Sequence, residues 1–253
     1  YKNTGMCDYP LIDYEIIKRG IEKGGIITST GRGSAPAFLT NTLCGFSKID
    51  RFKSPIKLYP ERFMSETRIL QTHSLPDIDF NLGTPEIFEE AQAEVMGEGH
   101  AYPMIAFGTF KKKSAFKLYA RAKGMDFDLA NNISKQIDNY EEAFKHAEED
   151  ERDTIDIYDY ISEEYHDYIR QSQKYWGIIS DRKKAPCAFL LYSGDIKSEI
   201  GLIKCKSESS KKEYITTVID GAIAEKYKFL KNDLLKVNTV LLTDLVYRRI
   251  GIE

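Results

Sequence analysis

Residues 72–81 read THSLPDIDFN and place two aspartates, Asp77 and Asp79, one residue apart in a short strand-like run. In a strand, side chains at i and i+2 lie on the same face, with their Cα atoms roughly 7 Å apart. Ile78 and Phe80 then face the core, and the two carboxylates share the opposite face. Carboxylates so placed repel each other unless a cation lies between them, and hard oxygen ligands of this kind suit Mg²⁺. The alternative is a solvated strand face or a turn, because the spacing alone is a weak motif.

Composition and terminal sequence limit the class of protein. The chain has 253 residues, enough for one large domain or two smaller ones, and its net charge of −3 argues against wholesale binding to nucleic acid. No apolar run reaches the ~18 residues of a membrane-spanning helix. The opening YKNTGMCDYP lacks a secretion signal and an initiator Met, so we expect an excised piece of a cytoplasmic protein. Scattered cysteines predict reduced thiols rather than disulfides or a zinc site: Cys7, Cys44, Cys187 and Cys205.

Apolar periodicity and turn residues predict a mixture of helices and strands. Helices are expected over residues 11–23, 35–44, 84–96 and 238–250. Strands are expected over residues 26–29, 74–82, 102–109, 187–193, 200–205, 213–219 and 228–235. Between Phe110 and about Gln173 the helical pattern dominates, so a mixed sheet region is interrupted and then resumes. The sequence therefore predicts an α+β domain with an inserted helical subdomain.

A glycine-rich turn lies upstream of the two aspartates, in GGIITSTGRGSAPAF at residues 24–38. A strand, a glycine-rich turn and a helix N-terminus in this order form a cradle for phosphate, because backbone N–H groups and the helix dipole favour an anion. Gly31 and Gly33 permit tight turns and close approach, and Ser34 offers a hydroxyl. No GK[ST] follows, so the turn is not a Walker A loop. The alternative is an ordinary turn with Ser34 as a helix N-cap.

A third acid, Asp233, lies in the strand-like segment FLKNDLLKV at residues 229–237. Strand alternation places Lys231 and Asp233 on one face and Asn232 on the other. An acid in such a run indicates a surface edge, a salt bridge with Lys231, or a metal site, and the sequence leaves these three open.

The run FKKKSAFKLYARAKG at residues 110–124 carries many cations and no acid. On a helix, Lys113, Lys117 and Arg121 recur at i, i+4 and i+8, which forms one stripe that could track a phosphate backbone. Phe116 lies off this stripe and is expected in the core. The alternative is a solvated helix face. Further along, the run from Tyr140 to Asp167 is strongly acidic, and Trp176 is expected to be a packing residue.

Four motifs follow one another along nearly the whole chain: GRGS at 31–34, PDID at 76–79, FGT at 107–109 before the basic helix, and LKND at 230–233. Together they resemble the catalytic core of the C-family bacterial replicative DNA polymerases, the alpha subunit of DNA polymerase III. YPERFMSETR at 59–68 is similar to a further segment of that family. KKAPCAFLLYS at 183–193 departs from the family's pattern.

The resemblance implies a polymerase-beta-like nucleotidyltransferase palm with a mixed sheet, interrupted by a mainly helical thumb insertion. The palm would comprise residues 1–108 and 185–253, and the thumb residues 109–184. The same resemblance implies two Mg²⁺ ions held by a catalytic triad of Asp77, Asp79 and Asp233. Nucleotide-binding residues would be Arg32, Gly33, Ser34, Arg62 and Lys231. DNA-binding residues would be Lys113, Lys117 and Arg121.

The implied function is DNA-directed DNA polymerase activity, in which two metal ions assist nucleotidyl transfer from a dNTP to a primer 3′-hydroxyl. The implied partners are primer–template DNA and dNTP, and, in a full-length protein, the fingers, the PHP domain and the sliding clamp, with no membrane. The main alternative is a non-catalytic palm–thumb module that binds DNA or a partner without polymerising. A glycosyltransferase that uses an Asp-x-Asp motif is a further alternative, but it predicts no use for Asp233 or the basic stripe.

Overall fold

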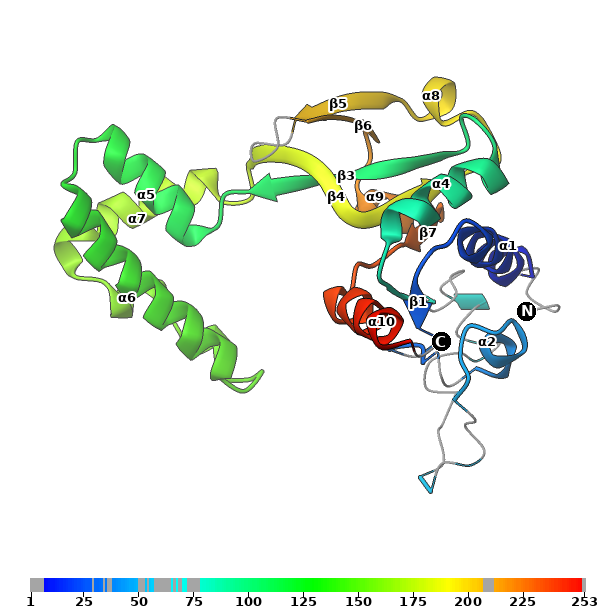
Figure 1. Cartoon of the computed structure of the whole chain (residues 1–253). Coiled ribbons are helices and arrows are strands. Elements are labelled where there is room, and N and C mark those ends of the chain that lie inside the picture. The colour runs from blue at the N-terminus through cyan, green and yellow to red at the C-terminus, as the bar shows by residue number, and fades with distance from the viewer. Residues whose placement is uncertain are drawn as a thin grey trace. The chain divides into compact units, whose positions relative to one another are not determined.

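The computed structural model describes residues 7–28, 30–33, 35, 38–49, 53, 55–56, 65, 67, 70–71, 78–206 and 212–251. The chain separates into two compact units (Figure 1). Unit 1 comprises Tyr1–Ala106 and Lys183–Glu253, and unit 2 comprises Phe107–Arg182. No helix of the described residues combines the length and apolar composition needed to cross a membrane.

Unit 1 is built from two segments of the chain. The first contains α1 (Asp8–Glu22), β1 (Ile27–Thr28), α2 (Leu39–Leu43), β2 (Asn81–Leu82), α4 (Pro85–Met96) and most of β3 (Ala101–Thr109). The second contains the end of β4 (Ile179–Leu191), α8 (Ile196–Glu199), β5 (Leu202–Lys206), β6 (Glu213–Thr217), α9 (Gly221–Lys226), β7 (Leu230–Asp233) and α10 (Asn238–Ile250). This mixture of helices with antiparallel pairs of strands agrees with the expected α+β class.

The sheets of unit 1 bring its two segments together. Strands β3, β4 and β7 form one sheet in the order β3-β4-β7, and β7 runs antiparallel to β4 with Ala188 opposite Asp233. Strand β2 pairs antiparallel with β1, with Thr28 opposite Asn81. Beyond this pair, Leu82 N donates to Leu235 O at 3.2 Å, and Val237 N donates to Leu82 O at 2.8 Å. Strand β2 therefore lies beside the chain that leaves β7.

Helices α1 and α4 pack side by side in unit 1 (Figure 1). Helix α4 follows the expected pattern, with Pro85 in its first turn and Gly97, at a φ of +87°, after its last residue. Its fully buried Phe88 lies against Gly20 of α1, where a Cβ would overlap the aromatic ring. Glycine at position 20 therefore allows the two helices to approach closely.

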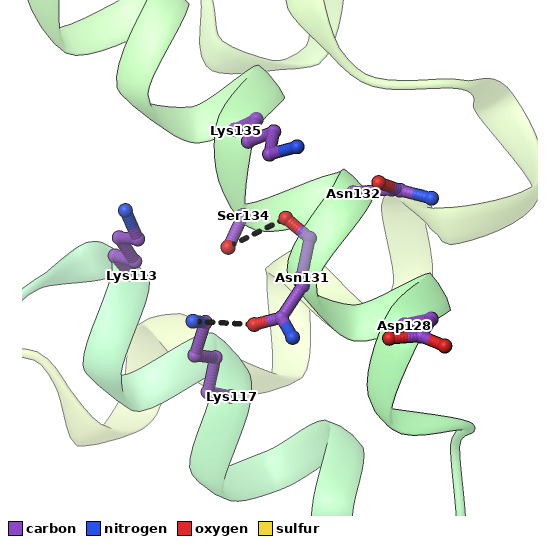
Figure 2. Close-up of a pocket in the computed structure, with 7 residues that line it drawn as sticks. All are labelled: Lys113, Lys117, Asp128, Asn131, Asn132, Ser134 and Lys135. Atoms are coloured by element: carbon purple, nitrogen blue, oxygen red, sulfur yellow. Dashed lines mark hydrogen bonds between the residues drawn. The ribbon is translucent and has the colours of Figure 1, made fainter.

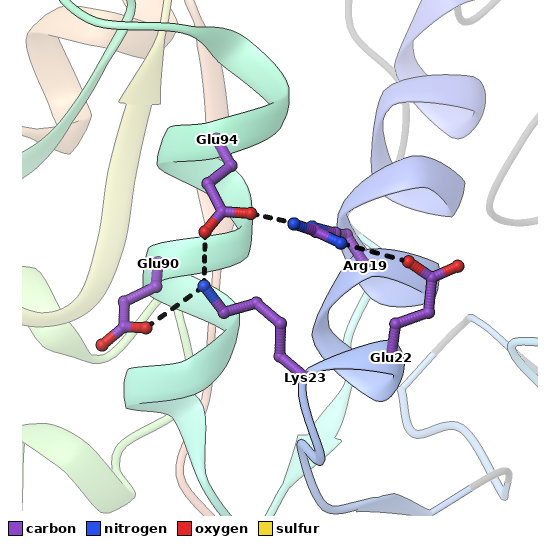
Figure 3. A network of polar contacts seen from close by, with 5 residues as sticks. All are labelled: Arg19, Glu22, Lys23, Glu90 and Glu94. Carbon is purple, nitrogen blue, oxygen red and sulfur yellow. Dashed lines mark hydrogen bonds and ion pairs between the residues drawn. The ribbon is translucent and has the colours of Figure 1, made fainter.

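A network of ion pairs covers the exposed side of this helix pair (Figure 3). Glu94 of α4 accepts from Arg19 Nε at 2.7 Å and from the ammonium group of Lys23. Lys23 also pairs with Glu90 at 3.3 Å. The hydrogen bonds from Lys23 and Arg19 lower the pKa of Glu94, because they stabilise its ionised form.

Glu94→Gln is therefore expected to lower the melting temperature at neutral pH, by a small amount because the pairs are exposed. Since the folded pKa of Glu94 is lowered, its contribution is present above the unfolded pKa of about 4.3 and is lost as the pH falls through the folded pKa. Thermal melts at neutral pH and near pH 3 measure this, with Glu98→Gln as the control outside the network. A difference between the two variants that persists at low pH would contradict the assignment.

Unit 2 is mainly helical, as the sequence predicts for the region after Phe110. It contains α5 (Lys112–Ala122), α6 (Phe127–His146), η4 (Arg152–Thr154), η5 (Ile157–Tyr160), η6 (Glu163–Tyr165), α7 (His166–Ser172) and η7 (Gln173–Tyr175). Its core includes Phe116 of α5, as expected, together with Ile133 and Ile137 of α6 and Ile169 of α7. Asp126 caps α6 by accepting from the backbone N–H groups of residues 128 and 129.

Lys112 connects the start of α5 to the end of α6. Its Nζ atom lies 5.2 Å from the ring centroid of Tyr140, 5.5 Å from that of Trp176 and 6.0 Å from that of Phe144. Glu141 Oε1 lies 3.8 Å from the same nitrogen. Three aromatic rings and one carboxylate therefore surround this cation in unit 2 and attract it. The contact confirms that Trp176 is a packing residue.

Four expectations about elements were wrong in their extent. The helix expected over 11–23 is α1, which begins earlier, at Asp8, and buries Asp13 and Ile16. The helix expected over 35–44 is α2, which starts at Leu39 with Phe38 in the cap position, and the expected cap Ser34 lies outside the described residues. Of the strand expected over 74–82, residues 74–77 lie outside the described residues, and among the rest only Asn81 and Leu82 form β2.

The largest difference is in β4, which begins at Ile179 rather than at Cys187. Its first residues are exposed and charged, so they carry none of the apolar pattern that predicts a strand. Pro186 also argues against a strand. It is accommodated on the side of β7, because β7 pairs with residues 188–191 and the proline lies outside that register.

Candidate active site

Asp79 lies two residues before β2, and the residues on either side of it fix its position. Ile78 and Phe80 are buried and Asp79 is half-buried, as strand alternation predicts. Two residues after Asp79, Asn81 Nδ2 donates to Gly31 O at 3.1 Å. The pairing of β1 with β2 and this side-chain bond together hold the glycine-rich turn beside the aspartate.

Gly33 meets the carboxylate of Asp79 directly. Its φ is +56°, a left-handed backbone conformation that glycine adopts without strain. A Cβ placed on Gly33 would lie 2.5 Å from Asp79 Oδ2, closer than two such atoms can approach. The absence of a side chain at position 33 is therefore what lets the turn lie against the acid. The exposed Arg32 lies in the same turn.

Asp233 ends β7, and its two carboxylate oxygens have different surroundings. Oδ2 accepts from Lys231 Nζ at 2.6 Å, which is the salt bridge that strand alternation allows. Oδ1 is buried and has no hydrogen-bond partner among the described residues. Asn232 points the opposite way and donates to Gln92 Oε1 at 2.8 Å in the interior. The chain therefore presents the acid and its lysine on one face of β7.

Cys187 of β4 lies within electrostatic range of two of the expected acids. Burial raises the pKa of its thiol, and the negative charge of Asp233 raises that pKa further. Lys231 opposes this effect, and Asp79 adds to it. One thiol on β4 is thus within electrostatic range of both acids, which lie 154 positions apart in the sequence.

Sequence reasoning did not include Cys187 among the site residues. The strand-like pattern CAFLL at residues 187–191 places it on an element, but only the pairing of Ala188 with Asp233 brings it to the acids. No pattern in a single sequence identifies that pairing.

Three of the expected site residues, Asp77, Ser34 and Arg62, lie outside the described residues. Within the described part of the chain, no three His, Cys, Asp or Glu side chains are grouped closely enough to hold a metal ion. The structure thus brings together Asp79, Asp233, Lys231 and the turn at Gly33 in unit 1.

The expected basic stripe lies in unit 2 and is partly paired. Lys113 forms an ion pair with Asp138 of α6, and Lys117 Nζ donates to Asn131 Oδ1 at 2.8 Å. Arg121, about one turn beyond Lys117 on α5, is exposed. Two lysines of the expected stripe therefore contact the neighbouring helix α6.

Comparison with known proteins identifies the class to which this fold and these acids belong. Residues 2–236 match a family model described as "Bacterial DNA polymerase III alpha NTPase domain", so the chain is a DNA polymerase-related domain. It belongs to the bacterial DNA polymerase III alpha family.

Its relatives are much longer proteins. The DNA polymerase III subunit alpha of Chlamydia muridarum is 27% identical over 257 residues, which cover 99% of this chain and 20% of that protein. The subunit of Chlamydia pneumoniae is 32% identical over 61% of this chain and 12% of its own length. That of Bacillus subtilis is 31% identical over 54% of this chain and 12% of its own length. The chain thus spans a fifth or less of these curated relatives.

Proposed function

We propose that this chain is the palm and thumb portion of a DNA-directed DNA polymerase. In the reaction, a primer 3′-hydroxyl attacks the α-phosphorus of a dNTP and pyrophosphate leaves. Residues 1–108 and 185–253 are assigned to a polymerase-beta-like palm, and residues 109–184 to the thumb. The observation that carries the proposal is the approach of the Gly33 turn to Asp79, together with the bonds of Leu82 to Leu235 and Val237, which hold the chain after Asp79 beside the chain after Asp233.

The acids fit a divalent cation. Asp233 Oδ1 is a buried carboxylate oxygen without a partner among the described residues, and such an atom is costly unless a cation or a donor satisfies it. Carboxylate oxygens are the ligands that Mg²⁺ prefers, and Asp79 and Asp233 would hold it together with Asp77. Two bound Mg²⁺ ions would lower the pKa of the primer 3′-hydroxyl and offset the charge of the triphosphate.

The remaining residues of the site are assigned to the triphosphate. The turn at Arg32 and Gly33 is suited to cradle phosphate oxygens, since no side chain at position 33 blocks their approach, and Ser34 would add its hydroxyl. Lys231 is kept beside Asp233 at 2.6 Å, where its ammonium group can contact a phosphate oxygen while it balances the acid. Arg32 and Arg62 add positive charge. These groups bind and orient the nucleotide, which supplies much of the acceleration in phosphoryl transfer.

The partners follow from the same assignment. We expect primer–template DNA and dNTP at unit 1, with Lys113, Lys117 and Arg121 of unit 2 near the DNA backbone. The fingers, the PHP domain and the sliding clamp would act in a full-length protein.

A second candidate is a non-catalytic palm–thumb module. It is favoured by the ion pair between Lys231 and Asp233, which satisfies one oxygen of the acid without any metal. The two candidates differ in whether the carboxylates are needed for nucleotide binding, and this can be measured.

Titration calorimetry of a dNTP into the chain, with and without Mg²⁺, tests the proposal. Binding is expected to require Mg²⁺ and to weaken at least about tenfold in Asp233→Asn, because removal of even the outer partners of metal ligands costs about that much. Asp8→Asn, at the exposed start of α1, is the matched control and is expected to bind like the unaltered chain. Binding that is indifferent to Mg²⁺ or to Asp233→Asn would favour the non-catalytic module.

A further inference from the structure

Unit 2 contains a hollow between α5 and α6 that includes two lysines of the basic stripe (Figure 2). Its volume is about 540 Å³, within the ~300–1,000 Å³ range of ligand pockets. Lys113 and Lys117 of α5 line one side, and Asn131, Asn132 and Lys135 of α6 line the other. The lining is polar on both helices, so its ligand is a polar group rather than an apolar one.

The charges in the hollow favour an anion. Three lysines line it, and the carboxylates that oppose them are Asp128 in the lining and Asp138, which pairs with Lys113. Lys117 donates to the neutral amide oxygen of Asn131, so no carboxylate offsets its charge in this contact. Lys135 is exposed. Three cations and two carboxylates leave a net positive charge.

The hydrogen bonds of Asn131 prepare the hollow for an acceptor. Its Oδ1 accepts from Lys117 Nζ at 2.8 Å, which leaves the Nδ2 group as a donor. Its backbone oxygen accepts from Ser134 Oγ at 2.8 Å (Figure 2). A donor amide beside two ammonium groups matches a phosphate group, which offers several acceptor oxygens and negative charge.

An exposed aromatic residue lies one turn from this donor. Phe127 is the first residue of α6 and is 76% exposed, although burying a phenylalanine is strongly favourable. Phe127 and Asn131 are four residues apart, so they share a face of the helix. A phosphate-binding hollow beside an exposed aromatic ring is the combination that binds single-stranded nucleic acid, in which bases stack on such rings.

We propose that this hollow binds a backbone phosphate of a single-stranded nucleic acid and that Phe127 stacks on a neighbouring base. The inference rests on the proposed function for the presence of nucleic acid near unit 2, but it does not involve the carboxylates of unit 1. This site differs from the basic stripe in its residues, because it includes Lys135 and Phe127 of α6 and excludes Arg121.

Fluorescence anisotropy of a labelled short oligothymidine, added to the whole chain, tests the proposal. Lys135→Gln is expected to weaken binding about fivefold and to lower the slope of log affinity against log salt by about 0.7. Phe127→Ala is expected to weaken binding about fivefold or more, through the lost stacking. Lys145→Gln is the matched control, because it removes the same charge from the same helix about 15 Å away.

The outcomes separate this inference from its rivals. Equal weakening by Lys135→Gln and Lys145→Gln, or no effect of Phe127→Ala, would overturn it. Competition by inorganic phosphate or dTMP as effective as that by unlabelled strand would assign the hollow to a free phosphate instead, and would also overturn it. Thermal melts check that the variants are folded, which is expected since all three side chains are exposed. The carboxylates of unit 1 take no part in this site, so the oligothymidine result stands whether or not dNTP binding proves to require Mg²⁺.

Discussion

Under the proposed polymerase function, Gly33→Ala is expected to lower the rate of nucleotidyl transfer about 100-fold, the effect of displacing a reacting group by ~1 Å. The added Cβ would lie 2.5 Å from Asp79 Oδ2, so the carboxylate or the turn must move. The positive φ of 56° adds strain of about 1 kcal/mol for any residue with a Cβ. Primer extension measures the rate, and thermal melting of the chain measures the strain.

Gly24→Ala separates these two effects. Gly24 has a φ of +86°, and a Cβ there would meet nothing within 4 Å among the described residues. It therefore carries the same kind of backbone strain without the contact to an acid. We expect both variants to lose similar stability, and only Gly33→Ala to lose activity. Equal loss of activity in Gly33→Ala and Gly24→Ala would show that the contact with Asp79 does not affect the reaction.

Phe116→Ala is expected to destabilise unit 2 by about 3–5 kcal/mol, the cost of removing a buried aromatic side chain and leaving a cavity. Phe116 is 0% exposed and belongs to the cluster that joins α5, α6 and α7. Because a domain is stable by only about 5–15 kcal/mol, this change brings unit 2 close to unfolding. Trp176, the single tryptophan of the chain, packs against the same cluster, so its fluorescence during urea unfolding measures this loss.

Phe127→Ala is the matched control for stability. It makes the same chemical change in the next helix, but Phe127 is 76% exposed, so the free energy of unfolding is expected to change by less than about 0.5 kcal/mol. Similar losses in the two variants would mean that the cluster around Phe116 does not hold unit 2 together.

The elements with clear periodicity were predictable from sequence. Helix α4 has a proline at its start and a glycine after its end, and α10 has a regular apolar pattern, so both were identified nearly in full. The first half of β4 was not predictable, because exposed charged residues carry no period-two pattern. Its conformation comes from pairing with β3, which is a tertiary effect.

The candidate site was predictable in part for a similar reason. Strand alternation gave the shared face of Lys231 and Asp233, and their ion pair confirms this. The spacing of the basic stripe gave the helix face of Lys113 and Lys117, but not their partners on α6. Those partners, and the contact of Gly33 with Asp79, depend on packing between distant segments. A single sequence contains no direct signal for such contacts.

The order in which the strands of unit 1 occur has a consequence for synthesis on the ribosome. Leu82 bonds to Leu235 and Val237, which are made about 150 residues later. At ~5–20 residues per second, the first segment of unit 1 waits about 10–30 s for these partners. The helices of unit 2 emerge during this interval, and their contacts are local, so they are expected to fold first. Until Leu235 and Val237 have been made, the nascent first segment of unit 1 exposes the edge of β2 that they will cover. This is the stage at which a chaperone would protect the chain.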